Sequence, residues 1–356
     1  MELYLAIIIL LTIFSLVDLL KNRAGKTSIN LFEYLFCFLP LIILVAIRSV
    51  GFDYDAYEDA YNLLHYNDLK DIFSDLQFEP GYIIANVISP SYIFLIFLMG
   101  TATLLIKFRT IIIISPFPIV SLLFFFLSYY LNFEMGQIRQ ALAMSITLFS
   151  ILYFSNKRIF IFLVVIASLF HYSALLFLLL LIIPIKIHKW YFYFILFLVA
   201  ILCYFTIEPA ISKLSEILPG FVGEKMTYYQ EDKGQMGISI PIIIVRLLII
   251  ILFIIFKPEI SKFKSPMYLF IFNIYFLSFL MYIAFAFLPQ ISGRGGTYFT
   301  IFDILLIPII LKAIKNDYFR IAVFGILLIA YIGIFASFIT TWNYSFIPYK
   351  TWFLKF

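Results

Sequence analysis

Apolar runs long enough to cross a lipid bilayer recur along the whole chain, and this feature limits the fold more than any other. A bilayer core of ~30 Å needs about 20 apolar residues in one helix. Hydrophobic residues make up 64% of the 356 residues and charged residues 13%, whereas soluble domains are about 45–50% apolar and about 25% charged. The sequence therefore predicts an all-α polytopic membrane protein.

The runs predict about 11–12 membrane segments in one transmembrane domain that spans residues 1–356. The outer loops are expected at about 48–82, 208–238 and 289–297. The first run, LYLAIIILLTIFSLVDLL, has no basic start and no small-residue cleavage pattern. We therefore expect it to be a retained membrane helix rather than a signal peptide.

The charge of each loop predicts on which side of the membrane it lies, because cytoplasmic loops are enriched in Lys and Arg. The basic KNRAGK at 21–26 and KFR at 107–109 are expected inside. The acidic segment after Arg48 and NFEMG at 132–136 are expected outside.

The stretch SLFHYSALL contains His171, one of three histidines in the chain. Residues 159–183 could form one tilted crossing, about 37 Å long at 1.5 Å per residue, but this would place every later basic loop outside. A reversal of the chain at SLFHYS gives two short helices and keeps those loops inside. The sequence favours this hairpin, because short helices at membrane depth are stable when protein or a wet cavity surrounds them.

Four arginines fall on the outer half of the predicted spans, against the positive-inside tendency: Arg48, Arg139, Arg246 and Arg294. Three of them have a structural explanation as well: a snorkelling side chain for Arg139, an ion pair for Arg246 and a loop tip for Arg294. Arg246 lies deep in an apolar run and needs a distant partner, either Asp303 or an anionic ligand.

The first outer loop combines carboxylates with tyrosines at helical spacing. Asp53, Tyr54 and Tyr57 lie in RSVGFDYDAY, and this pattern predicts a short interfacial helix. Tyrosine rings beside carboxylates suit sugar rings, although an aromatic belt at the headgroups would give the same pattern. Glu79 follows in FEPGY, where Pro and Gly indicate a turn.

Arginine binds phosphate bidentately and stays protonated. Several arginines and a histidine at the outer face therefore suggest a lipid-linked phosphate or pyrophosphate as the ligand. No metal-ligand spacing and no nucleotide-binding loop is visible in the sequence. We accordingly expect neither a metal nor another cofactor, and we expect the energy of the reaction to come with the substrate.

Five motifs occur in the order RSVGFDYDAY, FEPGY, GQIRQALA, FHYSA and GRGGTYF. In this order they resemble the EpsG/Wzy-type family of bacterial polysaccharide polymerases, from about Arg48 to Tyr298. The chain has Phe52 where that family usually has a threonine. The resemblance implies a GT-C-like architecture and a metal-independent, inverting glycosyl transfer at the outer or periplasmic face of the bacterial inner (plasma) membrane.

The resemblance also implies partners and roles. The expected donor and acceptor are glycans linked to undecaprenyl pyrophosphate. Membrane lipids and a chain-length regulator protein are the other expected partners, and no nucleic acid is expected. The candidate base is His171, with Asp53 and Glu79 as alternatives. The other assigned residues are Arg139, Arg294, Arg48 and Arg246 for the pyrophosphate and Tyr54, Tyr57 and Gln140 for sugar.

Two alternatives stay open at this point. An O-antigen ligase uses nearly the same chemistry to move a finished glycan onto another acceptor. A flippase or transporter of the lipid-linked unit is the alternative of a different class, although the sequence shows no matching halves. The product, whether O-antigen of lipopolysaccharide, capsule or exopolysaccharide, is not encoded visibly.

Overall fold

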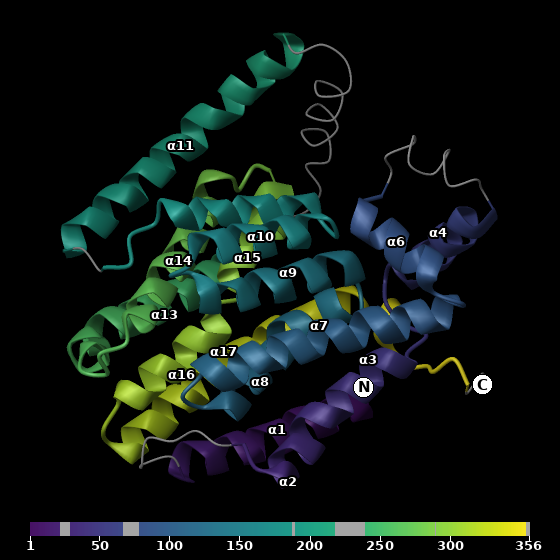
Figure 1. Ribbon diagram of the computed structural model, residues 1–356. Coiled ribbons are helices and arrows are strands. Elements are labelled where there is room, and N and C mark those ends of the chain that lie inside the picture. The colour runs from purple at the N-terminus through teal and green to yellow at the C-terminus, as the bar shows by residue number, and fades with distance from the viewer. Residues whose placement is uncertain (22–28, 67–77, 187–188, 218–238, 289, 354–356) are drawn as a thin grey trace. The chain divides into compact units, whose positions relative to one another are not determined.

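The computed structural model describes residues 1–356 except 22–28, 67–77, 187–188, 218–238, 289 and 354–356 (Figure 1). The structure is 82% helical, and the described residues form no strand beyond an isolated antiparallel bridge between Arg48 and Thr351. The prediction of an all-α protein is therefore confirmed.

Among the described residues, seven helical segments are long and apolar enough to cross a membrane, which confirms a multi-pass membrane protein. These segments are Glu2–Leu20, Tyr92–Ile114, Trp190–Ile207, Ile240–Ser261, Pro266–Ala284, Ser292–Ala313 and Asp317–Thr341. Four shorter apolar segments accompany them in the part of the chain that the structure describes: Leu31–Ile47, Pro118–Glu134, Ile138–Tyr153 and Tyr172–Leu181.

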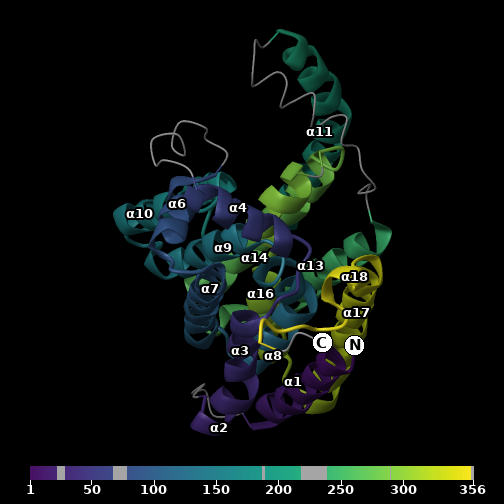
Figure 2. The ribbon, with the colours of Figure 1, turned by 90° about the vertical axis from the view of Figure 1, so that its right-hand side faces the viewer.

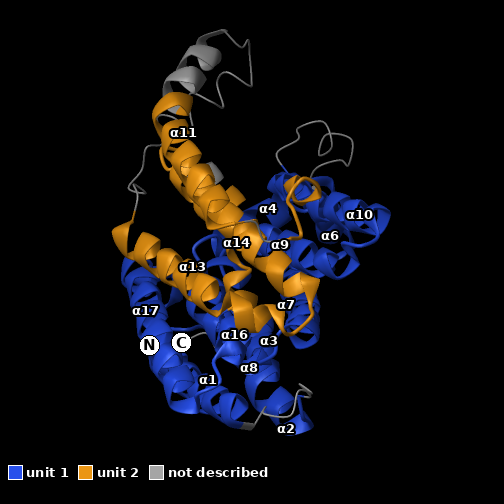
Figure 3. Cartoon of the chain, turned by 90° about the vertical axis from the view of Figure 1, so that its left-hand side faces the viewer, with its two compact units in different colours: residues 1–178, 307–356 blue, residues 179–306 orange. Residues whose placement is uncertain are grey.

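The chain divides into two compact units, residues 1–178 with 307–356 and residues 179–306 (Figure 3). The expectation of a single transmembrane domain stays a prediction. The elements of the first unit, in which η marks a π- or 3₁₀-helical stretch, are α1 (Glu2–Lys21), α2 (Leu31–Glu33), η2 (Tyr34–Phe38), α3 (Leu39–Ile47), α4 (Tyr54–Tyr66), α6 (Pro80–Ile88), α7 (Tyr92–Ile114), α8 (Pro118–Phe125), η3 (Phe126–Glu134), α9 (Ile138–Ser150), η4 (Ile151–Tyr153), α10 (Lys157–Ser168), η5 (Tyr172–Leu181), α16 (Asp303–Ala313), α17 (Asp317–Thr341) and α18 (Asn343–Phe346). Of these, η5 ends and α16 begins in the second unit.

The first unit is built around α8, all of whose residues are buried. A helix that is apolar on every side belongs inside a protein or a membrane, and α8 packs against α1, α7 and η2. Helices α3 and α9 pack on α7. A Cβ atom at Gly100 of α7 would collide with Val45 of α3, so this crossing depends on a glycine.

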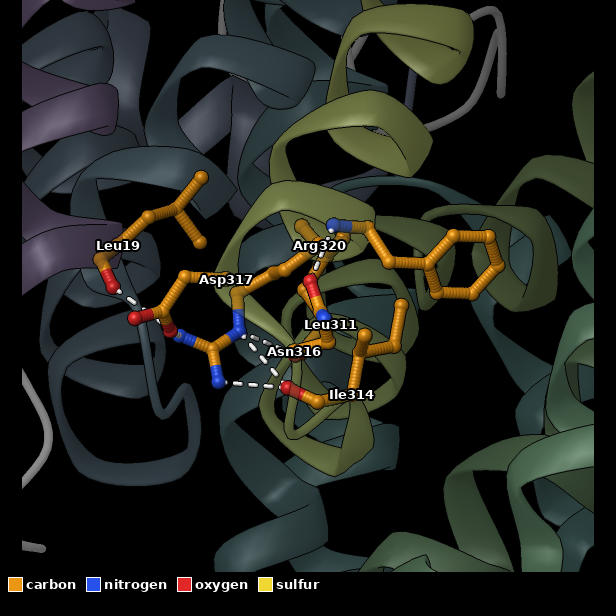
Figure 4. Close-up of polar contacts among 7 residues, drawn as sticks. Leu19, Leu311, Ile314, Asn316, Asp317 and Arg320 are labelled. Atoms are coloured by element: carbon orange, nitrogen blue, oxygen red, sulfur yellow. Dashed lines mark hydrogen bonds and ion pairs between the residues drawn. The ribbon is translucent and has the colours of Figure 1, made fainter.

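Arg320, in the first turn of α17, joins three helix ends (Figure 4). Its guanidinium donates to the carbonyls of Leu311 at 3.0 Å, Ile314 at 2.6 Å and Leu19 at 3.4 Å, and to the Asp317 carboxylate at 3.0 Å. The last carbonyls of a helix have no partner within it. Arg320 therefore supplies donors where α1 and α16 end.

The C-terminal segment returns to the end of α3 (Figure 2). Ser49 donates its N–H to Lys350 O at 2.9 Å, and the Tyr349 hydroxyl donates to Leu44 O at 2.7 Å. Gly51, with φ +135, donates to Ser345 O at 2.9 Å. These bonds fix the backbone between the end of α3 and the start of α4.

The second unit contains α11 (Trp190–Ile217), α13 (Ile240–Ser261), α14 (Pro266–Ala284), η6 (Gln290–Gly295) and α15 (Gly296–Thr300). Asn273 of α14 accepts from the Tyr193 hydroxyl at 2.8 Å and donates to Pro184 O at 2.6 Å. Polar side chains join helices in this way inside membranes. Helix α11 runs to Ile217, so the expected outer loop 208–238 begins as helix, and 218–238 lies outside the described residues.

Candidate active site

The segment expected as the first outer loop contains two short helices, α4 and α6, which lie side by side (Figures 1 and 2). The predicted helix of spaced tyrosines is confirmed, and Tyr57 and Tyr61 are buried. The rings of Tyr57 and Tyr82 lie 5.8 Å apart, and the Tyr61 hydroxyl donates to Ser89 O at 2.8 Å. Through these contacts α4 supports the turn that carries Glu79.

Glu79 occupies the N-cap position of α6, directly before Pro80. Proline is favoured as the first helical residue because its φ is already helical and it has no N–H to satisfy. An N-cap side chain commonly accepts from the first N–H groups of its own helix, but the Glu79 carboxylate makes no such bond. It is therefore available to other elements.

Arg139 lies in the first turn of α9. The chain reaches it through the π-helical η3 and a tight turn at Gly136, where a Cβ would collide with the Asn132 carbonyl and the Phe52 ring. The Arg139 side chain is 24% exposed. It thus reaches the surface of the first unit from an otherwise buried helix.

His171 lies between two helices, as the hairpin prediction required. α10 ends at Ser168 and η5 begins at Tyr172. The rings of Phe160 and Phe177 lie 5.9 Å apart, whereas 17 residues of one straight helix would separate them by about 25 Å. The chain therefore reverses at His171, and a single crossing over 159–183 is excluded.

The structure brings together Glu79, Arg139 and His171. The guanidinium Nη1 of Arg139 donates to Glu79 Oε2 at 2.5 Å, and His171 Nδ1 lies 2.9 Å from Glu79 Oε1. The Glu79 side chain is 7% exposed and that of His171 is 21% exposed. One buried carboxylate thus bridges an arginine and a histidine that both reach the surface.

The pKa of Glu79 reflects this position. Burial acts to raise the pKa of the Glu79 carboxyl, but the His171 hydrogen bond and the Arg139 charge outweigh burial, and the pKa lies below its ordinary value. The Arg139 guanidinium carbon also lies 5.7, 5.2 and 5.4 Å from the ring centres of Tyr57, Phe78 and Tyr82. Aromatic faces attract a cation, so these rings hold Arg139 beside the carboxylate.

Arg48 was predicted at the same pyrophosphate but lies elsewhere in the first unit. Its side chain is 1% exposed and donates to Val50 O at 2.7 Å and Glu134 O at 3.4 Å. The guanidinium also lies 5.8 Å from the ring centre of Tyr54. Both of its terminal nitrogens thus donate to backbone carbonyls, and its role at the pyrophosphate stays a prediction.

Arg246 and Arg294 belong to the second unit. Arg246 donates to Ser278 O and to the Thr300 hydroxyl, both at 3.3 Å, and its guanidinium lies 4.4 Å from the Tyr282 ring centre. Arg294 is exposed on η6. Their pyrophosphate role stays a prediction.

The remaining predicted residues lie in the same unit as the bridged carboxylate. The Asp53 carbonyl accepts from the Tyr57 N–H at 3.0 Å at the start of α4. The ring of Tyr54 lies 5.1 Å from that of Tyr92, and Gln140 is buried. Because Tyr57 and Gln140 are buried, their expected contact with sugar is not visible in this conformation and stays a prediction.

The buried pair of Lys107 and Glu134 escaped the sequence analysis. KFR at 107–109 and NFEMG at 132–136 were expected on opposite sides, but Lys107 lies inside α7 and contacts the Glu134 carboxylate directly. Both side chains are 0% exposed. A lysine deep in an apolar helix was the available signal, since a charge inside the membrane requires a partner inside the protein.

Among the residues that the structure describes, no three His, Cys, Asp or Glu side chains come together in a way that would hold a metal ion. The expectation of a metal-independent reaction stays a prediction.

The fold and the site define a class: a multi-pass α-helical membrane protein in which one buried carboxylate holds a partly exposed arginine and a partly exposed histidine. The match to known families is more specific. The EpsG family matches residues 31–351, nearly the whole chain, and the chain belongs to that family. Membership indicates a polysaccharide polymerase of glycosyltransferase type. No curated protein and no solved structure matches the chain.

Proposed function

We propose that this chain polymerises an oligosaccharide by transferring a growing glycan from a lipid pyrophosphate to a hydroxyl of a second lipid-linked unit. We place the reaction at the periplasmic or outer face of the bacterial plasma membrane, with undecaprenyl pyrophosphate as the carrier and a GT-C-like mechanism. The observation that carries this proposal is the Glu79 carboxylate, which holds both Arg139 and His171.

His171 is the proposed base. Because ionised Glu79 only accepts hydrogen bonds, the proton of the neutral imidazole sits on Nδ1 and leaves the lone pair on Nε2. The acceptor hydroxyl attacks the anomeric carbon, Nε2 takes its proton, and the bond to the pyrophosphate breaks with its electron pair on the leaving oxygen. Glu79 orients the imidazole and stabilises its charged form, as the carboxylate does in a catalytic triad.

Arg139 is the proposed partner of the pyrophosphate. Glu79 occupies Nη1, and a guanidinium has five N–H donors, so donors remain for phosphate oxygens. Preorganised charge at the leaving group stabilises the transition state because the site need not reorganise during the reaction. Arg294 is the second candidate for the pyrophosphate, and Asp53 stays an alternative base.

The test uses purified protein in lipid vesicles with an undecaprenyl-pyrophosphate-linked oligosaccharide, and reads product size on a gel. We expect a ladder of lengthened lipid-linked glycan. Arg139→Ala and His171→Ala should abolish the long products, whereas Arg158→Ala, an exposed arginine at the other end of α10, should not.

Three results would contradict the proposal. A normal ladder from both site variants would remove the roles of Arg139 and His171. Transfer to a lipid A core acceptor without lengthening would support the ligase, and movement of unchanged substrate across the vesicle membrane would support the flippase.

A further inference from the structure

The start of α6 and the end of α10 join through their backbones. The Gly81 N–H donates to Leu169 O at 2.7 Å. The first N–H groups of a helix and its last carbonyls have no partner within their own helix. Gly81 is the second residue of α6 and Leu169 is the C-cap of α10, so each helix satisfies an open group of the other.

This contact leaves no room for a side chain. A Cβ atom at Gly81 would lie 2.8 Å from Leu169 O and 3.1 Å from Leu169 Cβ. The first of these neighbours is backbone, so a larger residue would force the two segments apart. The need for glycine here comes from close approach and not from an unusual φ.

The same contact lies between the two side chains of the proposed active site. Glu79 comes two residues before Gly81, and His171 comes two residues after Leu169. Glu79 Oε1 and His171 Nδ1 are 2.9 Å apart. The backbone hydrogen bond therefore fixes the distance between the two chain segments that carry Glu79 and His171.

We propose that Gly81 is a positioning residue, which holds the turn from Leu169 to His171 close enough for the His171 imidazole to bind the Glu79 carboxylate. This proposal rests on the proposed function for its effect on turnover. A displacement of about 1 Å at reacting groups costs about 10²-fold in rate. Gly81→Ala should therefore lower kcat by about 10²-fold and leave KM for the lipid-linked donor within about twofold.

Two other glycines provide matched controls for the same substitution. A Cβ at Gly325 of α17 would meet nothing within 4 Å, so Gly325→Ala should leave turnover unchanged. A Cβ at Gly100 would collide with Val45, so Gly100→Ala should destabilise the helix packing without a specific effect at His171. The full-length protein is used in every case.

The direct measurement is the NMR signal of the His171 Nδ1–H, followed in nanodiscs with ¹⁵N-labelled histidine. The chain has three histidines, and His171→Gln identifies the signal. In Gly81→Ala the signal should lose its hydrogen-bonded shift and the pH profile of kcat should change as it does in Glu79→Gln. Both should stay as in the wild type in Gly100→Ala and Gly325→Ala.

The outcomes separate the two proposals. An unchanged His171 signal in Gly81→Ala would overturn the positioning role, whatever the activity. Normal turnover in Glu79→Gln and His171→Ala would instead overturn the proposed function, while a lost signal in Gly81→Ala would still support the structural half of this inference. Turnover in Gly81→Ala equal to that in Gly325→Ala would contradict the inference even if the site residues matter.

Discussion

Replacement of Glu79 by glutamine is the sharpest test of the site, because it changes the charge and keeps the shape. The carboxylate accepts from Arg139 at 2.5 Å and from His171 at 2.9 Å. A glutamine keeps one carbonyl oxygen and turns an NH₂ group toward the other donor. If the NH₂ group faces His171, it favours the tautomer with the proton on Nε2, so the base is lost. If it faces Arg139, two donors oppose each other and that hydrogen bond is lost.

The size of the effect follows from these contacts. A hydrogen bond to a charged group contributes about 1.5–3 kcal/mol, and Arg139, 24% exposed, would lose its ionic partner. We expect Glu79→Gln to lower the free energy of unfolding by about 2–4 kcal/mol. In a catalytic triad the loss of the orienting carboxylate lowers kcat by about 10⁴-fold, and we expect a fall in kcat of about 10²-fold or more here.

The assay measures the steady-state rate of chain extension in vesicles, together with thermal unfolding of the same preparation. Glu58→Gln is the control, since Glu58 is exposed on α4. Wild-type turnover in Glu79→Gln at unchanged pH dependence would refute the assignment of Glu79 as the residue that orients the base. An equal loss in Glu58→Gln would show a general effect of charge on this surface.

The remaining predictions concern pH and two structural ion networks. Because the pKa of Glu79 is lowered in the folded state, its ionised form stabilises the folded protein at pH values above the ordinary pKa. This stabilisation is lost as pH falls through the folded-state pKa. The free energy of unfolding should therefore decrease less on acidification in Glu79→Gln than in the wild type. Lys107→Met should destabilise by about 3–5 kcal/mol, because Glu134 then stays buried without its cation, and Lys107→Met combined with Glu134→Leu should recover most of the loss in thermal unfolding. Arg320→Ala should lower the melting temperature more than Arg320→Lys, since lysine keeps the charge but not the fork that reaches several carbonyls.

Local sequence was sufficient for several features of the fold. The spaced tyrosines of α4 and the turn before α6 follow from helical periodicity and from Pro80 and Gly81. The break at His171 followed from the charges of the loops beyond it, because only a reversal kept the basic loops on one side. The first two features depend on residues close in the sequence, and the third depends on the positive-inside tendency applied to all loops.

The roles of the arginines could not be separated in this way. Arg48 and Arg139 both end or begin an apolar run near acidic residues, yet Arg48 donates to buried carbonyls and Arg139 pairs with Glu79 at the surface. The backbone of Arg48 also pairs with Thr351 in the returning C-terminal segment. The sequence around Arg48 gives no sign that it pairs with the C-terminal segment, about 300 residues away.

The sequence alone determined that this chain is a helical membrane protein, because its apolar runs are long enough to cross a bilayer, where a helix satisfies its own backbone hydrogen bonds. The polysaccharide-polymerase type came from the resemblance of five ordered motifs to the EpsG family. Only the tertiary structure decided which charges meet. Glu79 contacts Arg139, 60 residues away in the sequence, and His171, 92 residues away. Lys107 contacts Glu134, 27 residues away. A charge buried among apolar helices must be paired, but which partner it takes depends on how the helices pack, and helix packing is not written in any one segment.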